Sequence, residues 1–323
     1  MQRILILGGG GMIGQKLAWH LAGEGLNGDR DLDVTLHDLG YPEPSAPGRK
    51  RIGNVAVAGT MTAAVAEKPD VIFHLASVVS GEAEQDYDKG WAVNMHPMWE
   101  LLEALRAHQA ADPGYCPKVI FSSSIAVFGA PYPEAIGDTF LSAPLSSYGA
   151  QKAVCELMLS DASRKGFVDG ISIRLPTVCV RPGKPNKAAS GFFSGIIREP
   201  LNGKEAVLPV DDSVRHWLAS PRSAVGFLVH AAGLDSARLE GRRALNMPGF
   251  SCTIAEQIEA LRRAAGEDAV KLIRREPDEA IINIVKNWPR NFQTDRALAL
   301  GFTAESDFDE IIRVYIEDER PGC

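Results

Sequence analysis

The sequence predicts an α/β protein: a doubly wound parallel sheet with a smaller, discontinuous α/β domain toward the C-terminus. The first half of the chain alternates short apolar runs with helix-like segments. The runs are apolar on both faces, which is typical of parallel strands buried between two layers of helices. The alternation weakens after Pro176, and residues 181–203 become rich in Pro, Gly, Lys and Asn. That change of pattern predicts loops and short helices that cover one edge of the sheet.

The apolar runs and the helical periodicity assign the individual elements. We expect strands at residues 4–7, 34–37, 55–58, 71–75, 119–122 and 171–175. We expect helices at residues 12–21, 62–67, 93–108, 149–164, 191–197, 221–234, 253–265 and 307–318. The sheet domain then comprises residues 1–175 plus 222–248, and the smaller domain comprises residues 176–221 plus 249–323. An acidic stretch predicts a solvated loop; its residues are Glu82, Glu84, Asp86 and Asp88.

Composition excludes several classes of function. The chain has 323 residues, a net charge of −7 and 45% hydrophobic residues, so it can bury a large core. The negative charge argues against a nucleic-acid surface, which needs clustered Lys and Arg. Neither a signal peptide nor an apolar run long enough to cross a membrane is visible. Five unpaired-looking cysteines indicate a reducing, cytoplasmic compartment. The seven histidines form no HxxH or HxxxH pair, so no metal site is expected.

A glycine-rich turn joins the first strand to the first helix. The segment reads Gly8-Gly9-Gly10-Gly11-Met12-Ile13-Gly14. Glycines let the backbone turn tightly and approach a pyrophosphate, and the following helix offers free N–H groups and the positive end of its dipole. This strand–turn–helix setting predicts a Rossmann-type dinucleotide site that involves Gly8, Gly11 and Gly14.

An acidic residue ends the second expected strand. Asp38 lies 24 residues after the last glycine, Gly14, where a carboxylate can accept hydrogen bonds from the adenosine ribose hydroxyls. The same carboxylate would repel a 2′-phosphate. The sequence therefore predicts NAD, rather than NADP, as the cofactor.

Tyr148 and Lys152 are the expected catalytic pair. Residues four apart lie on one face of a helix, so these two side chains are neighbours. A nearby ammonium stabilises a phenolate, which lets a tyrosine accept a hydroxyl proton while hydride leaves the same carbon. Three serines, Ser122 to Ser124, end an apolar strand. Because ligands collect at the carboxyl ends of such strands, a serine hydroxyl there can hold the substrate oxygen.

The motifs together resemble those of the extended short-chain dehydrogenases/reductases, also called NAD-dependent epimerases/dehydratases. The matching residues cover most of the chain and occur in the family's order. They are Gly8, Gly11, Gly14, Asp38, His74-Leu75-Ala76-Ser77, Asn94, Ser122-Ser123-Ser124, Val127-Phe128-Gly129, Tyr148, Lys152 and Arg174-Leu175-Pro176.

The resemblance implies roles for these positions. Ser124 is then the catalytic serine, Tyr148 the general base, and Lys152 a ligand of the nicotinamide ribose. Further cofactor contacts are implied at Met12, Ile13, Leu75, Ala76, Asn94, Ser122, Pro176 and Val178. Relatives commonly pair the helices near residues 93–108 and 149–164 into a four-helix bundle, so the resemblance also implies a homodimer.

Departures from the family pattern bear on the substrate. Members that act on nucleotide-sugars commonly carry Asn where this chain has Thr177. They also follow the arginine at position 215 with an Asp-aromatic-aliphatic-His run, whereas this chain reads Arg215-His216-Trp217-Leu218-Ala219. Segments around residues 174–186, 195–201 and 217–222 instead resemble a subgroup that oxidises the C2 hydroxyl of a four-carbon sugar acid to a 2-keto acid.

Three functions stay open at this point. The leading one is the net oxidation of a small sugar acid, and the alternative is a nucleotide-sugar epimerase or dehydratase that regenerates bound NAD. The third is a non-enzymatic, NAD-sensing regulator of the same fold, which need not keep the Ser, Tyr and Lys together. A sugar acid has a carboxylate, for which a bidentate arginine is a good partner. Arg215 is the first candidate and Arg181 the second. Side chains that can bind substrate hydroxyls are Ser80, Thr177 and Asn186.

Overall fold

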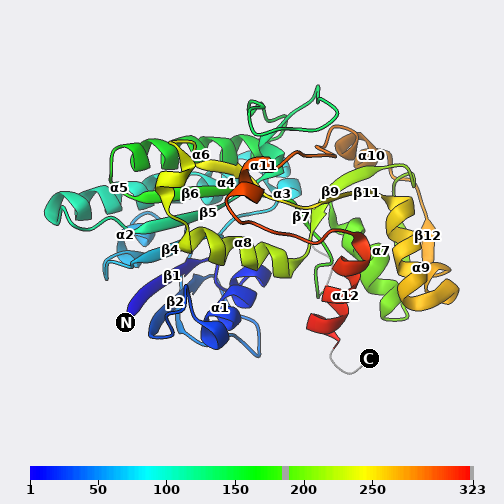
Figure 1. Cartoon of the computed structure of the whole chain (residues 1–323), viewed down its shortest axis with the longest axis horizontal. Coiled ribbons are helices and arrows are strands. Elements are labelled where there is room, and N and C mark those ends of the chain that lie inside the picture. The colour runs from blue at the N-terminus through cyan, green and yellow to red at the C-terminus, as the bar shows by residue number, and fades with distance from the viewer. Residues whose placement is uncertain (184–188, 321–323) are drawn as a thin grey trace.

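The computed structural model describes residues 1–183 and 189–320. Its centre is a seven-stranded sheet in the order β10-β6-β5-β4-β1-β2-β3, and every neighbouring pair is parallel (Figure 1). The strands are β1 (Gln2–Leu7), β2 (Leu32–Asp38), β3 (Arg49–Ile52), β4 (Val71–His74), β5 (Lys118–Ser124), β6 (Asp169–Leu175) and β10 (Ala244–Asn246). The predicted doubly wound parallel sheet is confirmed.

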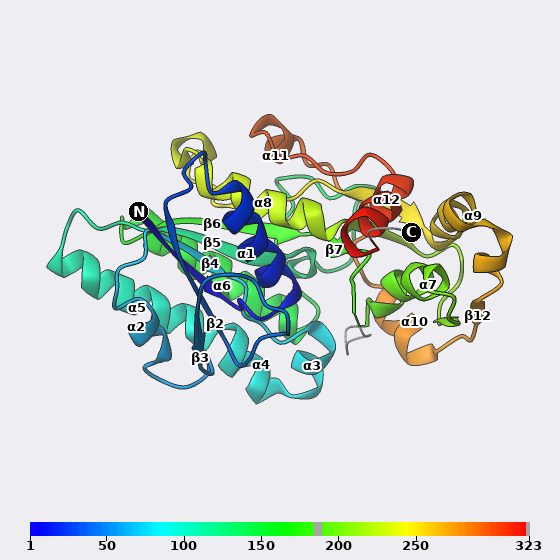
Figure 2. The same ribbon diagram turned by 90° about the horizontal axis from the view of Figure 1, so that it is seen from below.

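Helices cover both faces of the sheet (Figure 2). Helices α1 (Met12–Glu24) and α8 (Pro221–Gly233) share one hydrophobic core with one face of the strands. Helices α2 (Thr60–Ala64), α5 (His96–Ala111) and α6 (Ser147–Arg164) share a second core with the opposite face. Because both faces are covered, residues 4–7 of β1 and 71–73 of β4 are all apolar. Among the described residues, no helix is long and apolar enough to cross a lipid bilayer.

A smaller α/β unit sits at the carboxyl ends of the strands. It has its own hydrophobic core and two small sheets, β11-β9-β7 and β12-β8. Its elements are β7 (Thr177–Val178), α7 (Gly191–Leu201), β8 (Ala206–Leu208), β9 (Arg215–Ala219), β11 (Phe250–Thr253), α9 (Ile254–Val270), β12 (Ile273–Arg275), α10 (Glu279–Val285) and α12 (Phe308–Glu319).

One segment of the C-terminal region packs with the large sheet instead. Ala297, Leu300 and Phe302, from α11 (Asp295–Ala299) and the turn after it, belong to the same core as α1 and α8. The chain therefore returns to the large sheet before α12.

The predicted strand at residues 55–58 is wrong. These residues form turns, and the edge strand is β3, whose sequence Arg-Lys-Arg-Ile has no apolar run. An edge strand is paired on one side only and tolerates charged side chains. Val55 is buried against the helices of the α5 face, so its apolar character reflects packing and not strand formation.

Residues 80–108 also differ from the expectation. The acidic stretch is helical: it spans α3 (Ser80–Gln85) and the start of α4 (Tyr87–Asn94), and the Asp86 carboxylate caps α4 by accepting from the Lys89 N–H at 3.0 Å. The single helix predicted at 93–108 is interrupted at Met95, where α4 ends and α5 begins. Pro97 fits the first turn of α5 because that turn needs no N–H donor.

Candidate active site

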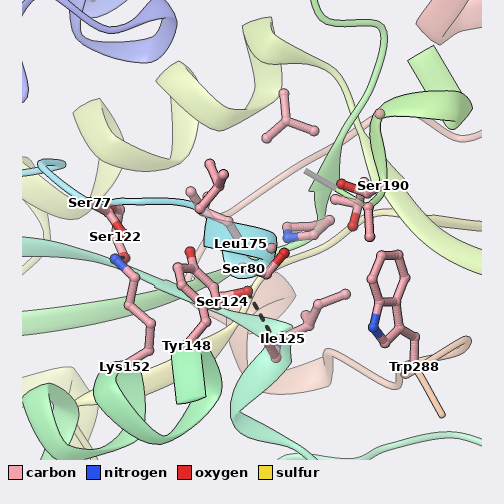
Figure 3. A pocket seen from close by; sticks show the side chains of 18 of the residues that line it. Ser77, Ser80, Ser122, Ser124, Ile125, Tyr148, Lys152, Leu175, Ser190 and Trp288 are labelled. Atoms are coloured by element: carbon pink, nitrogen blue, oxygen red, sulfur yellow. Dashed lines mark hydrogen bonds between the residues drawn. The ribbon is translucent and has the colours of Figure 1, made fainter. Parts of the chain in front are cut away.

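A cavity of about 730 Å³ lies where the strand ends of the large sheet face the smaller unit. One side is formed by the glycine loop and the residues that follow β4, β5 and β6. The other side is formed by α7, His216 and residues 283–289. Figure 3 shows Lys152 and Tyr148 on one side of this cavity, and Ser190 and Trp288 on the other.

The glycine loop leaves room for a dinucleotide. Gly8 has φ of +87°, and a Cβ added there would lie 2.6 Å from the backbone nitrogen of Ala76. A Cβ on Gly14 would lie 2.2 Å from the Gly8 carbonyl oxygen, so the loop needs glycine at both positions. Gly11 is the N-cap of α1 and has no side chain to occupy the N–H groups of the first turn. Both the shape and the exposed N–H groups fit the pyrophosphate of NAD.

Asp38 ends β2 and holds this loop. Its two carboxylate oxygens accept hydrogen bonds from the N–H groups of Gly10 at 2.8 Å and Leu39 at 2.6 Å. The side chain does not line the cavity itself. Its contact with the adenosine ribose remains a prediction, while its role in closing the glycine loop is visible.

Ser124, Tyr148 and Lys152 line the same cavity (Figure 3). Ser124 is the last residue of β5, and Tyr148 lies in the first turn of α6, which Ser146 caps. The Lys152 ammonium lies 5.5 Å from the centroid of the Tyr148 ring and donates to the Ser122 carbonyl at 2.8 Å. The helical spacing thus brings the cation beside the phenol, as the sequence predicts.

His74 lies behind this group and is fully buried. Burial, together with the positive charge of Lys152, lowers its pKa to about 3. The imidazole is therefore neutral near pH 7. Its main-chain carbonyl accepts from the Ser122 hydroxyl at 3.1 Å, which links β4 to β5 beneath the site.

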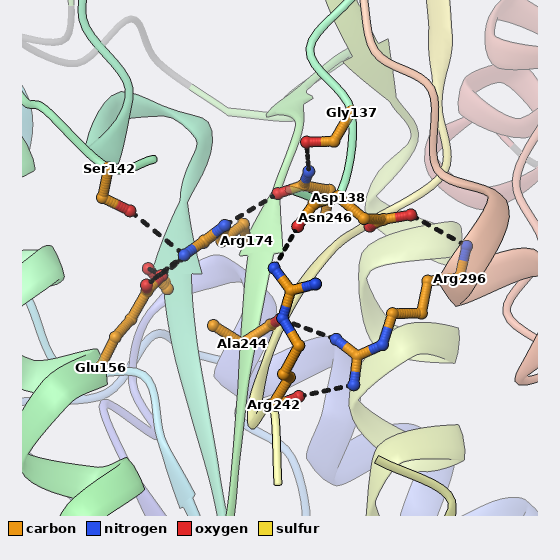
Figure 4. Close-up of polar contacts among 10 residues, drawn as sticks. Gly137, Asp138, Ser142, Glu156, Arg174, Arg242, Ala244, Asn246 and Arg296 are labelled. Atoms are coloured by element: carbon orange, nitrogen blue, oxygen red, sulfur yellow. Dashed lines mark hydrogen bonds and ion pairs between the residues drawn. The ribbon is translucent and has the colours of Figure 1, made fainter. Parts of the chain in front are cut away.

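A buried ion pair anchors α6 against the sheet (Figure 4). Glu156 lies one turn after Lys152 and pairs with the Arg174 guanidinium of β6 at 2.7 Å. It also accepts from the Ser123 hydroxyl at 2.5 Å. The Arg174 guanidinium also donates a hydrogen bond to the Asn246 side-chain oxygen of β10 at 3.2 Å. Helix α6 is thus fixed relative to β5 and β6, which sets the position of the catalytic pair.

The other predicted cofactor residues divide into two groups. Those that line the cavity are Met12, Ile13, Leu75, Ser122, Pro176 and Val178. Ala76 instead backs Gly8, as described above. Asn94 is buried beside the cavity, where it accepts from the Val78 N–H at 2.8 Å and donates to Gln151 at 2.7 Å. Asn94 therefore connects the segment after β4 to α6.

The predicted substrate residues also differ in whether they line the cavity. Ser80, Thr177 and Arg181 line the cavity. Arg215 does not: its guanidinium donates to the Ser251 carbonyl at 2.9 Å and pairs with Glu256 at 3.3 Å. Asn186 lies outside the described residues.

Arg181 is a partly buried cation that lines the same cavity as the catalytic tyrosine. Burial lowers its pKa, and the Tyr148 phenol opposes that shift electrostatically. Arginine stays charged even so. Within residues 1–183 and 189–320, no carboxylate lies within 4.0 Å of this guanidinium, whereas neighbouring Arg198 is paired with Glu199. Arg181 thus carries a positive charge that a ligand carboxylate can neutralise.

Several cavity residues are not apparent from the sequence. They are Glu84, Ser190, Ser194, Arg198, His216, Asn287 and Trp288. The sequence does carry a signal for Arg198, because it is one of two charged residues in the mostly apolar helix α7. His216 had another, since it stands where nucleotide-sugar enzymes carry Asp. Trp288 follows a short helix far along the chain and gives no comparable signal.

The parallel sheet, the glycine loop and the Ser–Tyr–Lys group define an NAD-dependent enzyme of the extended short-chain dehydrogenase/reductase class. The chain belongs to the NAD dependent epimerase/dehydratase family, whose sequence profile matches residues 4–226. The predicted family and its cofactor NAD are confirmed.

Two curated relatives match over nearly the whole chain. One is the D-erythronate dehydrogenase of Cupriavidus necator, 46% identical over 322 residues, with 98% of both chains covered. The other is the D-erythronate dehydrogenase of Haemophilus influenzae, 44% identical over 320 residues, with 98% of this chain and 99% of that one covered. The predicted resemblance to sugar-acid dehydrogenases is confirmed.

Solved structures share the fold. A protein from Agrobacterium tumefaciens described as a nucleoside-diphosphate-sugar epimerase is 55% identical, with a TM-score of 0.95. That match covers 100% of this chain and 95% of the other. L-threonine dehydrogenase from Clostridium difficile has a TM-score of 0.85 at 23% identity, with 98% and 97% covered. The second likeness concerns the fold alone.

Proposed function

We propose that the protein is an NAD-dependent dehydrogenase that oxidises the C2 hydroxyl of D-erythronate, or of a closely similar small sugar acid, to a 2-keto acid. The observation that carries the proposal is Arg181. Its partly buried guanidinium has no carboxylate partner in the described part of the chain and shares one cavity with Ser124 and Tyr148. A bidentate arginine is well suited to hold a carboxylate next to the reacting carbon. The names of the two relatives near 45% identity agree with this choice.

Each catalytic residue then has one task. The carboxylate binds Arg181, which orients the C2 hydroxyl toward Ser124 and Tyr148. Ser124 holds the C2 oxygen, and Tyr148 takes its proton as general base. Lys152 stabilises the phenolate and binds the nicotinamide ribose. NAD, when bound, accepts the hydride from C2, which leaves a ketone, NADH and one proton.

The remaining contacts follow from the cavity wall. We assign the pyrophosphate to Gly8, Gly11 and Gly14, and the adenosine ribose to Asp38. Ser80 and Thr177 are substrate hydroxyl ligands. The predicted division of labour is kept: residues 1–175 plus 222–248 bind NAD, and residues 176–221 plus 249–323 contribute the substrate wall.

A nucleotide-sugar epimerase is the second candidate, since a 55% identical structure carries that description. Such an enzyme must bind the diphosphate and the nucleobase of its substrate in addition to the sugar. At positions 177 and 216, nucleotide-sugar enzymes commonly carry Asn and Asp where they bind the nucleotide-sugar. This chain has Thr177 and His216 instead, which favours the smaller acid as substrate.

The two candidates give different products. We expect NADH absorbance to rise when the protein is mixed with NAD and D-erythronate, and not with UDP-glucose or UDP-galactose. An epimerase would interconvert the UDP-sugars, as seen by chromatography, without accumulating NADH. Epimerisation in the absence of any sugar-acid oxidation would contradict the proposal.

We also propose a cytoplasmic homodimer. The outer surfaces of α5 and α6 expose Trp99 and Leu157, which are 57% and 72% accessible. Large apolar side chains on neighbouring helices are suited to pairing with a second copy. Four cysteines in the described part of the chain are free thiols, as is usual in a reducing compartment. Sedimentation equilibrium should give twice the chain mass, and Leu157→Glu should shift it toward the monomer.

A further inference from the structure

Two side chains of helix α7 hold the main chain of Arg181. The Arg181 N–H donates to the Ser194 hydroxyl oxygen at 3.0 Å, and the Arg181 carbonyl accepts from Arg198 Nη1 at 2.8 Å. Ser194 and Arg198 are four residues apart in α7, so one face of the helix presents both groups. Both main-chain polar groups of residue 181 are thus fixed by a single helix.

These two contacts lie in the interior of the smaller unit. Ser194 is 2% exposed and Arg198 is 5% exposed. Hydrogen bonds that are shielded from water are stronger, and a buried main-chain group that loses its partner costs free energy. Phe193 and Ile196 anchor α7 in the hydrophobic core of the same unit. The main chain of Arg181 is therefore positioned by α7.

The head group of Arg181 is held at one of its nitrogens. Nε donates to the Val178 carbonyl at 3.1 Å. With Nε engaged, the edge formed by Nη1 and Nη2 is the one that can make two parallel hydrogen bonds with a carboxylate. Two fixed points, the main chain at one end and Nε at the other, define the direction of this edge. A shift of the main chain would turn the edge away from the substrate.

Arg198 lines the cavity but is not suited to bind the carboxylate itself. Its Nε donates to the Glu199 carboxylate at 3.0 Å, and its Nη2 pairs with the same group. Its Nη1 is used by the Arg181 carbonyl. All three nitrogens of this guanidinium therefore have partners within the protein, and its charge is balanced by Glu199.

We infer that Ser194 and Arg198 are positioning residues, which fix the main chain of Arg181 so that its guanidinium meets the substrate carboxylate. The pair thereby sets the affinity of the enzyme for the acid. This inference rests on the proposed function, because it takes Arg181 as the ligand of the carboxylate. Neither side chain has to touch the substrate, since the effect of each passes through Arg181.

The first test measures kcat and KM for D-erythronate in Ser194→Ala. This change removes the acceptor of the Arg181 N–H and leaves every charge in place. KM should rise about tenfold, the value of one hydrogen bond. The kcat should stay within about threefold, because Arg181 holds the carboxylate alike in the bound substrate and in the transition state. The Kd for NAD should not change.

The second test removes the contact to the Arg181 carbonyl. Arg198→Met alone would leave the Glu199 carboxylate without its cation, and that charge would repel an acid substrate. The variant therefore combines Arg198→Met with Glu199→Gln. Glu199→Gln alone is the matched control, because it keeps the bond from Arg198 to Arg181. The combined variant should raise KM for D-erythronate by about tenfold, and the control should not raise it.

A double-mutant cycle separates positioning from a general effect on the cavity. In an Arg181→Met background, Ser194→Ala and the combined variant should lower kcat/KM by less than about twofold more, because the residue that they position is gone. Losses as large as those in the wild-type background would mean that these side chains bind the substrate directly or shape the whole cavity. That result would overturn the inference.

The remaining outcomes separate the inference from the proposed function. A wild type that does not oxidise D-erythronate, or an Arg181→Met variant with the KM of the wild type, overturns the proposed function and the inference with it. If D-erythronate is oxidised and Arg181→Met raises KM, an unchanged KM in Ser194→Ala and in the combined variant overturns the inference alone. If the combined variant fails to fold, Ser194→Ala and its cycle with Arg181→Met still decide the question.

Discussion

Replacing Arg181 by Met removes the positive charge that we assign to the substrate carboxylate and keeps a long side chain in the cavity wall. The free protein already holds this guanidinium partly buried, and within residues 1–183 and 189–320 it has no carboxylate partner. The main-chain contact that its Nε makes with the Val178 carbonyl, at 3.1 Å, orients the head group. The substrate therefore meets a preorganised cation.

The expected loss follows from the hydrogen bonds removed. A hydrogen bond to a charged group contributes about 1.5–3 kcal/mol, and a bidentate pair contains two. A loss of about 3–6 kcal/mol corresponds to roughly two to four orders of magnitude in kcat/KM. Arg181→Lys keeps the charge without the planar fork and should lose about tenfold.

The assay is NADH formation with D-erythronate at varied concentration, with NAD affinity and thermal stability measured on the same preparations. Arg215→Met is the matched control, since that arginine pairs with Glu256 and the Ser251 carbonyl outside the cavity. It should retain kcat/KM within about threefold. The reasoning is refuted if Arg181→Met keeps near-normal activity, and most directly if Arg215→Met is the variant that loses it.

Three further predictions concern the catalytic base, the cofactor and acid stability. Tyr148→Phe should lower kcat by about 10³-fold and leave the Kd for NAD nearly unchanged, because general-base catalysis supplies roughly that factor; normal turnover would contradict its role. Asp38→Asn should shift the kcat/KM ratio of NAD to NADP toward NADP by about tenfold, and an unchanged ratio would count against the ribose contact. His74 and His216 have folded-state pKa values near 3, below the unfolded value of 6.5, so the unfolded state binds more protons as the pH falls. Each should lower the free energy of unfolding by about 2 kcal/mol between pH 7 and pH 5. Urea titrations at pH 7 and pH 5 measure this loss. In His216→Gln the free energy of unfolding should fall by about half as much as in the wild type, and a pH dependence equal to that of the wild type would contradict the lowered pKa of His216.

Much of the fold was predictable because its signals are local. A parallel strand buried on both faces gives an uninterrupted apolar run, as in residues 4–7 of β1 and 71–73 of β4. The turn after β1 leaves no room for a Cβ at Gly8 or Gly14, so glycine marks it in the sequence. The edge strand β3 was missed for the converse reason: one face and one edge meet solvent, so no apolar run is needed.

The acidic stretch after Ser80 shows a second limit of local signals. Its carboxylates face solvent whether the backbone is a loop or a helix, so charge alone did not distinguish the two. Packing of Ala83 in the interior and the Asp86 cap on α4 stabilise the helices. Glu84, on the same stretch, lines the cavity.

The sequence by itself determined the class of chemistry. Tyr148 and Lys152 are neighbours because a helix repeats every 3.6 residues, and the glycine loop lies beside them because strand ends of a parallel sheet share one edge. Only the tertiary structure decided which of the two arginines lines the cavity, and that Thr177 touches His216. Those relations join segments far apart in the chain, where no periodicity links one residue to the other. They depend on how the smaller unit packs over the sheet, which turned Arg181 inward and left Arg215 paired with Glu256.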